Sequence, residues 1–260
     1  MRARGIMTSA VGQGPRYGNW VSARLLYTLA LGAVGLALLT ALTRWLVVPT
    51  AGALLALAYF AWARYEFSVS GGDVQSKIRG LVLQHLDWDG TGSVLDIGCG
   101  SGALVVAAAK RYPEARLTGV DSWGSAWEYS CAMCASNAAM EGVADRVTFQ
   151  QASASALPFP NGAFDAAISN LTFHEVHDTK DKAELLKEAL RVVRKGGSFA
   201  FQDLFLWKRV YGDVPALLMA VRGWGVERVE FTDTSGSAFI PRALRLPFMV
   251  GTIGVLHGRK

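Results

Sequence analysis

The chain has 260 residues, of which 51% are hydrophobic and 18% charged, and a formal net charge of +5. This length suits one globular domain of about 200 residues plus an extension, and the three cysteines do not support a disulfide framework. Six arginines and no acidic residue precede Glu66, which leaves 20 basic against 21 acidic residues afterwards and excludes a basic nucleic-acid-binding domain there.

The extension contains two uncharged apolar runs. Residues 25–43 and 45–63 each span 19 positions and are divided only by Arg44. A helix that crosses a bilayer needs about 20 apolar residues, so the runs predict a transmembrane helical hairpin with Trp45 and Pro49 near its turn. A re-entrant hairpin and a helical pair buried against the domain remain alternatives. A cleavable signal peptide is disfavoured because the apolar stretch is long and divided in two.

Basic residues flank the hairpin on both sides. They are Arg2, Arg4, Arg16 and Arg24 before it, and Arg64, Lys77 and Arg79 after it. Because basic flanks stay on the cytoplasmic side, we expect the protein at the cell membrane with its domain facing the cytoplasm. Residues 1–65 are expected to be the membrane anchor and residues 66–260 a domain that folds without it, with a linker at 66–73.

A glycine-rich turn follows a helix predicted over residues 74–86. Residues 94–102 read VLDIGCGSG, an apolar strand that passes through Asp96 into glycines at 98, 100 and 102. Glycines let the backbone turn tightly and approach a ligand without a Cβ in the way. The helix predicted over residues 103–109 would point its N-terminus at that ligand.

Two classes of cofactor could use this turn. The spacing Gly98-x-Gly100-x-x-Ala103 satisfies the pattern of dinucleotide-binding folds, with Asp121 placed for a ribose hydroxyl. A fixed anion at Asp96, however, has no use beside a pyrophosphate, and an ionised group there is costly unless something polar meets it. The turn therefore favours a cationic cofactor over a dinucleotide.

Strands alternate with helices further along the chain. Predicted strands cover 116–120, 147–151, 164–169 and 198–206, with helices over 125–141 and 180–193, and two last strands over 226–232 and 251–257. The helix over 180–193 is expected to stop at Arg194-Lys195-Gly196-Gly197, where basic residues and glycine form a C-terminal signal. This alternation predicts a parallel sheet with helices on both faces.

The glycine turn and its preceding acid resemble the first motif of class I S-adenosylmethionine (SAM)-dependent methyltransferases. LPFP at 157–160, FDAA at 164–167 and LRVVRKGG at 190–197 look like the methyltransferases of small molecules, such as those of quinone and sterol biosynthesis. The resemblance covers roughly residues 74–206. It implies an α/β fold with a Rossmann-like, seven-stranded, mostly parallel sheet and an antiparallel last strand, here preceded by the hairpin. It also implies SAM as the cofactor, with Asp96 at the cationic methionine end and Asp121 at the ribose hydroxyls.

The resemblance places the cofactor-binding residues on the turn and at the ends of the following strands. The candidates are Asp96, Gly98, Cys99, Gly100, Gly102, Asp121, Ser122, Trp123, Ser153, Ala154 and Asn170. Many family members carry an acid after the third strand that binds the adenine amino group. Here the run is QASASA, so Ser153 or a backbone amide takes that task. The Asn-Pro-Pro-aromatic run of the DNA- and amide-methylating branch is replaced by Asn-Leu-Thr-Phe from Asn170, which disfavours methylation of nucleic acid.

Catalytic candidates follow the fourth strand, at the sheet edge where α/β proteins bind ligands. His174, Glu175 and His177 lie there, with Asp178 or Glu175 able to orient either imidazole. Histidine suits proton removal near neutral pH, so His174 is expected to be the general base and His177 its substitute. The alternative is that these residues only cap and solvate a loop.

We therefore expect a membrane-anchored SAM-dependent methyltransferase that acts on a small or lipophilic acceptor and binds no nucleic acid. No metal is expected, because Cys131-x-x-Cys134 has no second cysteine pair nearby. Two other functions stay open, an NAD(P)-linked Rossmann oxidoreductase and a SAM-binding regulatory protein without turnover. Calorimetry that compares the binding of SAM and of NAD would test the oxidoreductase alternative. Incubation of the protein with labelled SAM and a membrane lipid extract would test the regulatory alternative.

Overall fold

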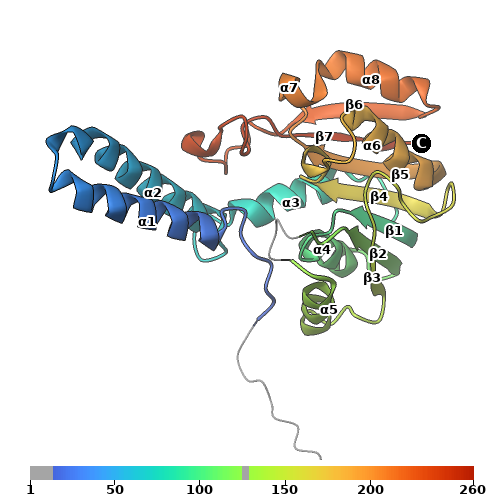
Figure 1. Ribbon diagram of the computed structural model, residues 1–260. Coiled ribbons are helices and arrows are strands. Elements are labelled where there is room, and N and C mark those ends of the chain that lie inside the picture. The colour runs from blue at the N-terminus through green and yellow to red at the C-terminus, as the bar shows by residue number, and fades with distance from the viewer. Residues whose placement is uncertain (1–13, 125–128) are drawn as a thin grey trace, which may run out of the picture.

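The computed structural model describes residues 14–124 and 129–260 and shows a helical hairpin projecting from an α/β domain (Figure 1). The hairpin consists of α1 (Ala23–Thr40), the short 3₁₀ turn η1 (Arg44–Leu46) and α2 (Val47–Phe67). The strands of the domain are β1 (Gly92–Ile97), β2 (Ala115–Asp121), β3 (Val147–Gln151), β4 (Phe164–Asn170), β5 (Val193–Asp203), β6 (Arg228–Asp233) and β7 (Gly254–Arg259). Its helices are α3 (Val74–His85), α4 (Ala103–Arg111), α5 (Cys131–Met140), α6 (Lys182–Val192), α7 (Lys208–Tyr211) and α8 (Val214–Gly223), with 3₁₀ turns η2 (Phe173–Glu175) and η3 (Arg242–Leu244).

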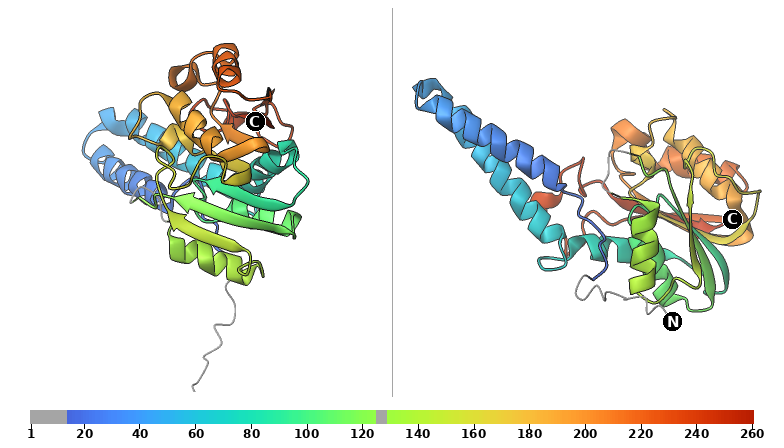
Figure 2. Two further views of the ribbon diagram at one scale, coloured as in Figure 1. Left: turned by 90° about the vertical axis from the view of Figure 1, so that its right-hand side faces the viewer. Right: turned by 60° about the horizontal axis from the view of Figure 1, so that its bottom comes forward.

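The seven strands form one sheet in the order β3-β2-β1-β4-β5-β7-β6. Strand β7 pairs antiparallel with β5 and β6, and the pairs from β3 to β5 are parallel. Apolar side chains of the two faces pack against α6 and α8 on one side and against α3, α4 and α5 on the other (Figure 2). The predicted α/β fold with a seven-stranded, mostly parallel sheet is confirmed.

The order of the strands fixes where a ligand can lie. Strand β1 pairs with β2 on one side and with β4 on the other, so the direction of winding reverses between β1 and β4. In an open α/β sheet, the crevice at the carboxyl ends of such strands binds ligands. Both strands are mostly buried, and their middle residues are apolar, because helices cover both faces. Polar side chains at their ends are therefore the exceptions that mark the site.

Strand β5 differs from the prediction at its start. It begins at Val193 directly after α6, so that Arg194-Lys195-Gly196-Gly197 belongs to the strand and not to a helix stop. A register shift in the pairing with β4 absorbs the extra residues as a bulge, where Gly196 has a φ of 74°. The predicted start of this strand at residue 198 is wrong, because residues 194–197, which were expected to end the preceding helix, belong to β5.

Helix α5 also begins later than predicted. It starts at Cys131, and residues 125–128 of the expected helix lie outside the described residues. Cys131 is exposed and Cys134 is buried, so the two thiols do not share an environment. Among the described residues, no group of histidine, cysteine and acidic side chains could hold a metal ion.

The two hairpin helices present apolar surfaces outwards. Both are long and apolar enough to cross a membrane, with mean hydropathies of 1.7 and 1.8 and only 6% and 11% of the residues buried. At 1.5 Å per residue, α1 is about 27 Å and α2 about 32 Å long, against a hydrocarbon core of about 30 Å. Thr40 and Thr50 share a 2.8 Å hydrogen bond between the helices near the tip, where Trp45 is 92% exposed. The alternative of a helical pair buried against the domain is wrong, because so little of either helix is covered.

The base of the hairpin, in contrast, packs into the domain. Val21, Ala63 and Phe67 are buried in one apolar cluster with residues of α3 and of the C-terminal part of the chain. Helix α2 continues to Phe67, beyond the expected boundary at residue 65. The expected boundary between anchor and domain at residue 65 therefore falls inside the apolar cluster that joins the two parts.

The chain before α1 crosses the domain as a strap, which we define as residues 14–22. The amide of Arg16 donates to Asn137 Oδ1 of α5 at 2.7 Å, and Asn137 returns a bond to the Arg16 carbonyl at 2.8 Å. The carbonyl of Tyr17 accepts from the Ser101 hydroxyl of the glycine turn at 2.9 Å. The strap thus connects the glycine turn and α5 to the hairpin. Arg2 and Arg4, predicted to flank the hairpin, lie outside the described residues.

Candidate functional site

The glycine turn joins β1 to α4 in a backbone conformation that requires glycine. Gly98, Gly100 and Gly102 have φ values of 72°, 55° and 81°, which side chains rarely tolerate. At Gly98, an added Cβ would also collide with the Thr172 side chain. The amide of Gly98 donates to the Val120 carbonyl at the end of β2 at 2.8 Å, which holds the turn over the sheet edge.

Asp96 is a buried carboxylate without an internal partner. It lies in β1, two residues before the turn, and is 1% exposed. Neither of its oxygens accepts a hydrogen bond from the described residues. Burial raises the pKa of Asp96, the nearby Val105 amide lowers it and the charge of Asp121 raises it, with a net result of about 8, so the carboxyl is protonated at neutral pH when no cation is near. A carboxylate held so unfavourably fits a site that receives a cationic group from a ligand.

A cavity of about 690 Å³ lies at the carboxyl ends of β1, β2, β3 and β4. Every predicted cofactor-binding residue except Gly102 lines it, as do His174, Glu175 and His177. Gly102 instead caps the start of α4, where a Cβ would lie 3.4 Å from that of Cys134. A second hollow of about 620 Å³, beside α6, does not reach the glycine turn. The larger cavity has the size of ordinary cofactor and ligand sites.

The second acidic residue, Asp121, ends β2 and faces the turn. Its two oxygens accept from the amides of Gly100 at 2.9 Å and Trp123 at 2.7 Å. The indole of Trp123 donates to the Gly100 carbonyl at 2.9 Å, so its ring is fixed beside the turn, next to the exposed Ser122. Asp121 is thus presented at the cavity wall by neighbouring backbone.

Cys99 stays an ordinary protonated thiol. Its contact with Cys134 and its burial raise its pKa well above the usual range. At the end of β4, the side-chain oxygen of Asn170 is buried in the cavity wall without a partner among the described residues. Cys99 therefore fills space, whereas Asn170 offers an unused acceptor.

Ser153 and Ala154 follow β3, and Ser153 is tied to an acid from another loop. Asp178 accepts from the Ser153 hydroxyl at 2.8 Å and from the Ser155 hydroxyl at 2.5 Å. These bonds lower the pKa of Asp178, so it is ionised at neutral pH. The expectation that Asp178 orients an imidazole is wrong. Asp178 instead places a carboxylate beside Ser153, in the region after β3 where many family members carry an acidic residue and this chain does not.

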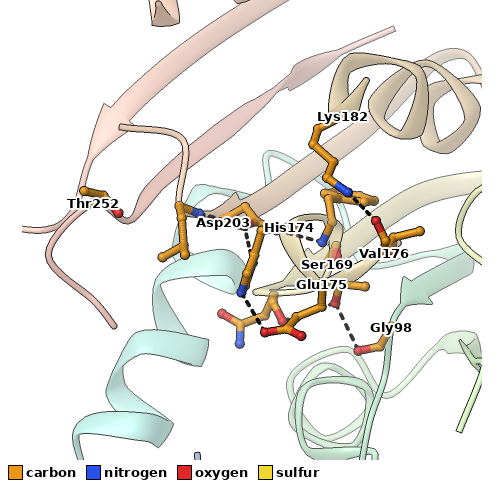
Figure 3. A network of polar contacts seen from close by, with 12 residues as sticks. Gly98, Ser169, His174, Glu175, Val176, Lys182, Asp203 and Thr252 are labelled. Carbon is orange, nitrogen blue, oxygen red and sulfur yellow. Dashed lines mark hydrogen bonds and ion pairs between the residues drawn. The ribbon is translucent and has the colours of Figure 1, made fainter. Parts of the chain in front are cut away.

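The ring of His174 lies between two carboxylates (Figure 3). Its Nδ1 is 2.6 Å from Asp203 Oδ1, and its Nε2 is 3.3 Å from Glu175 Oε1. Burial alone would lower the pKa of His174, but the two carboxylates outweigh it and raise that pKa to about 10. The ring therefore carries a proton at neutral pH, which counts against a general base there, and the catalytic role of His174 stays a prediction. It holds Glu175, whose side chain is 45% exposed, at the cavity wall.

Asp203 is a site residue that the sequence did not single out. It ends β5, is fully buried, and also accepts from the Phe173 amide at 2.8 Å. Burial would raise its pKa, but the charge of His174 outweighs this and lowers it. Tyr211 lies beside it, and burial together with the Asp203 charge raises the pKa of that phenol. His174 was selected because polar residues just after a strand of an α/β sheet often belong to the site. The same criterion, applied to the end of β5, would have selected Asp203. His177 lines the cavity as an exposed side chain.

Arg79 is a second residue that the sequence did not place in the site. It comes from α3 and lines the cavity near Gln75. Its guanidinium donates to the Ser76 hydroxyl at 3.1 Å, and no carboxylate among the described residues lies within ion-pair distance. Burial lowers its pKa from the ordinary value, although a guanidinium remains charged at neutral pH. The cavity thus holds a buried cation without an ion-pair partner among the described residues and, at Asp96, a buried carboxyl that a cationic ligand would ionise.

Comparison with known proteins finds relatives of this domain. Residues 94–197 match the family described as "Methyltransferase domain". This match and the relatives below support a SAM-dependent methyltransferase. Similar curated proteins are the ribosomal RNA small subunit methyltransferases C of Klebsiella pneumoniae subsp. pneumoniae and Shigella flexneri serotype 5b, 37% and 38% identical over 133 residues. Each match covers 50% of this chain and 36% of the relative, so the chain spans about a third of their length.

Solved structures show the same fold. The [4+2]-cyclase SpnF has a TM-score of 0.55 at 20% identity, covering 71% of this chain and 80% of its own. Geranyl diphosphate C-methyltransferase from Streptomyces coelicolor A3(2), in complex with Mg²⁺, geranyl diphosphate and S-adenosyl-L-homocysteine, has a TM-score of 0.52 at 18% identity, covering 72% and 79%. At these identities the likeness concerns the fold alone.

The methyltransferase domain uses SAM as its cofactor, and the cavity fits that molecule. The methionine end of SAM carries an ammonium, which would meet the unpartnered Asp96, and a carboxylate, which would meet Arg79. Asp121 would hold the ribose hydroxyls, and Asp178 with Ser153 the adenine end. The buried carboxyl of Asp96, whose oxygens accept no hydrogen bond from the described residues, is the observation that supports this fit.

Arg79 gives the first testable expectation. Replacing it with methionine should weaken SAM binding by about 1–3 kcal/mol, the range for a lost hydrogen bond to a charged group. Isothermal titration calorimetry with SAM measures the effect. The control is Lys77→Met, which removes the same charge from an exposed position of the same helix. Equal affinities in the two variants would show that Arg79 does not contact the cofactor.

Proposed function

We propose that this protein is a membrane-anchored methyltransferase that moves the methyl group of SAM to a small, lipophilic acceptor. One observation carries the proposal: the cavity that contains the glycine turn extends to the base of the apolar hairpin. Asp96 and Gly98 line this cavity, and so do Trp20, Val21 and Phe67 at the base of the hairpin. The cofactor site and the hairpin therefore share one hollow.

The outer surface of the hairpin supports a place at the cell membrane. Two helices with this hydropathy and so little burial would expose a large apolar surface to water, which soluble proteins rarely do. Arg24 and Arg64 stand at the domain end of the two helices, and basic residues stay on the cytoplasmic side. The proposed arrangement has the methyltransferase domain in the cytoplasm, where SAM is made and used.

The polar residues of the cavity suit a reaction that depends on alignment. SAM supplies a methyl group on a sulfonium, and transfer needs the acceptor atom in line with it. Glu175 is ionised, since its bond to His174 lowers its pKa, and can accept a hydrogen bond from an N–H or O–H of the acceptor. His174 and Asp203 fix Glu175 and act as positioning residues.

Methylation of RNA is the second candidate, because the curated relatives are named for it. The run from Asn170 to Phe173 keeps the asparagine and the aromatic ring of the nucleic-acid-methylating pattern. Phe173, however, is fully buried and packs edge-on against Phe201 with 5.6 Å between ring centroids. It cannot offer a ring face to an extruded base. The buried ring therefore counts against RNA as the acceptor.

The proposal is tested with the full-length protein and SAM labelled in its methyl group. Incubation with a membrane lipid extract should place the label in the organic phase, and incubation with ribosomal RNA should leave the RNA unlabelled. Label in RNA alone would establish the second candidate. Binding of SAM without any transfer would indicate a regulatory protein, and binding of NAD in preference to SAM an oxidoreductase.

Excision of the hairpin separates anchoring from cofactor binding. Replacing residues 28–57 with a short glycine-serine turn removes the exposed parts of α1 and α2 but keeps the strap and the buried base. We expect a variant that no longer floats with vesicles and binds SAM within a few-fold of the wild type. Deleting residues 1–64 should be more damaging, because it also removes Val21 and Ala63 from the apolar cluster. Flotation and calorimetry test both variants, and equal behaviour would mean that the base does not support the domain.

A further inference from the structure

The apolar end of the cofactor cavity forms a passage beside the hairpin. We use this term for the part lined by Trp20, Val21, Phe67, Phe248, Met249 and Val250. Phe248 at its rim is 57% exposed, whereas Val21, Phe67 and Val250 are almost completely buried. The passage therefore runs from the surface into the interior between mostly apolar side chains, with Gln75 beside Trp20.

Contacts between α2 and the C-terminal segment hold the walls of the passage. Tyr59 of α2 donates to the Ala243 carbonyl at 2.8 Å and lies 3.4 Å from the Met249 sulfur. On the other wall, Trp20 packs edge-on against Phe67 with 5.4 Å between ring centroids. These contacts set the passage next to the two exposed apolar helices, as the position of the C-terminal segment near α2 also shows (Figure 1).

The inner end of the passage is polar and belongs to the reaction site. Leu171 packs in the same apolar cluster as Phe67, Thr172 donates to the Gly98 carbonyl, and Glu175 lines the same cavity. A single ligand that filled this space would need an apolar part that contacts the base of the hairpin and a polar group near Glu175. Amphipathic lipids have this form, with one polar head on an apolar chain.

We propose that the methyl acceptor is a lipid of the bilayer that enters the passage from the membrane side, head first. The inference rests on the proposed function and adds the substrate class and its route. A bilayer source is favoured over a soluble carrier because Met249, next to Phe248 at the rim, contacts Tyr59 of α2, and α2 is long and apolar enough to cross a membrane. The lipid chain stays between the hairpin base and residues 248–250, while the head group reaches the cofactor.

The transfer balances without another reactant. The lone pair of the head-group atom forms the new bond to the methyl carbon, and the sulfur–carbon pair remains on sulfur as a thioether. The positive charge passes to the acceptor, which releases any proton that it carries on that atom to Glu175 and then to water.

Photo-cross-linking tests the route. The full-length protein, with p-benzoylphenylalanine in place of Phe248, is reconstituted in vesicles of dioleoylphosphatidylcholine and dioleoylphosphatidylglycerol and irradiated. Mass spectrometry should find lipid adducts at position 248 and, as a bilayer control, at position 38, where Leu38 is 69% exposed on α1. Position 219 on α8, where Met219 is 66% exposed, should give none. Adducts at position 38 without any at 248 would overturn the proposed route.

A charge at the rim gives an independent test. Phe248→Asp should lower transfer of labelled methyl to vesicles of membrane lipid extract by about tenfold, because a carboxylate obstructs an apolar chain. Its SAM affinity should not change, and the control Met219→Asp should transfer at the wild-type rate. Unchanged transfer in Phe248→Asp would overturn the route yet leave the proposed function standing. Loss of SAM binding or of all transfer in the wild type would instead contradict the proposed function.

Discussion

Replacing Asp96 with asparagine should weaken SAM binding and at the same time stabilise the protein without SAM. The buried carboxylate has no partner among the described residues, so its charge opposes folding when the cofactor is absent. With SAM bound, the same charge meets an ammonium, and its loss should cost about 10- to 100-fold in affinity. Few substitutions change stability and ligand affinity in opposite directions, which makes this pair of measurements specific.

The pH dependence of the stability follows from the pKa of Asp96. Its pKa in the folded protein is about 8, above the ordinary 3.8, so the folded state binds the proton more tightly than the unfolded chain. The resulting stabilisation is complete below about pH 4 and is lost as the pH rises to about 8. Asp96→Asn lacks this loss, so its melting temperature should exceed that of the wild type increasingly toward pH 8, by about 2–4 °C per kcal/mol.

Scanning calorimetry without SAM and titration calorimetry with SAM supply both measurements. Asp145→Asn is the matched control, since Asp145 is 78% exposed and its removal should affect neither quantity. SAM binding by the wild type near pH 7 should also release protons into the buffer, because the ammonium favours the ionised carboxylate. A variant with unchanged SAM affinity would remove Asp96 from the cofactor site.

The second large effect is expected at Asp203, the carboxylate that charges His174. Asp203→Asn should move the pKa of His174 from about 10 back toward 6.5, because the nearest negative charge is removed. If the imidazolium positions Glu175, the variant should lose activity about tenfold per pH unit above its new pKa. The wild type should retain activity up to about pH 10. His174→Ala should lower turnover about 100-fold at all pH values, as expected for a misplaced group.

A general base would reverse this pattern. A neutral imidazole would then be the active form, and Asp203→Asn would gain activity at neutral pH while the wild type became active only toward pH 10. The profile of kcat against pH, measured with the lipid extract as acceptor, distinguishes the two roles by the sign of the change. Asp213→Asn, which alters an exposed ion pair with Lys208, should leave the profile unchanged. Titration of the His174 ring by NMR gives its pKa without any reaction.

The predictable parts of this structure are those that depend on local pattern. The strand, acid and glycines of residues 94–102 lie next to one another in the chain, and their spacing defines the turn without any distant contact. Strand β3 was predicted to the residue, and the hairpin helices were recognisable because apolar composition is itself the signal. The roles of the individual cofactor-binding residues remain predictions.

The unpredicted parts depend on contacts between distant segments. Asp203 acts on His174 across 29 positions, and the strap reaches Asn137 across 121. The charge state of His174 follows from Asp203, so the sequence suggested a base where the structure holds a cation. The start of β5 was misplaced because a glycine pair that usually ends a helix here forms a bulge.

The strap has a consequence for how the membrane and the cofactor influence each other. Residues 14–22 bond to the glycine turn at Ser101 and to α5 at Asn137, and they continue directly into α1. Anything that restrains α1, including a bilayer, therefore also restrains a segment whose Tyr17 and Trp20 line the cofactor cavity. Thermodynamic reciprocity requires the converse: if the lipid surface alters the affinity for SAM, SAM alters the affinity for the surface by the same factor.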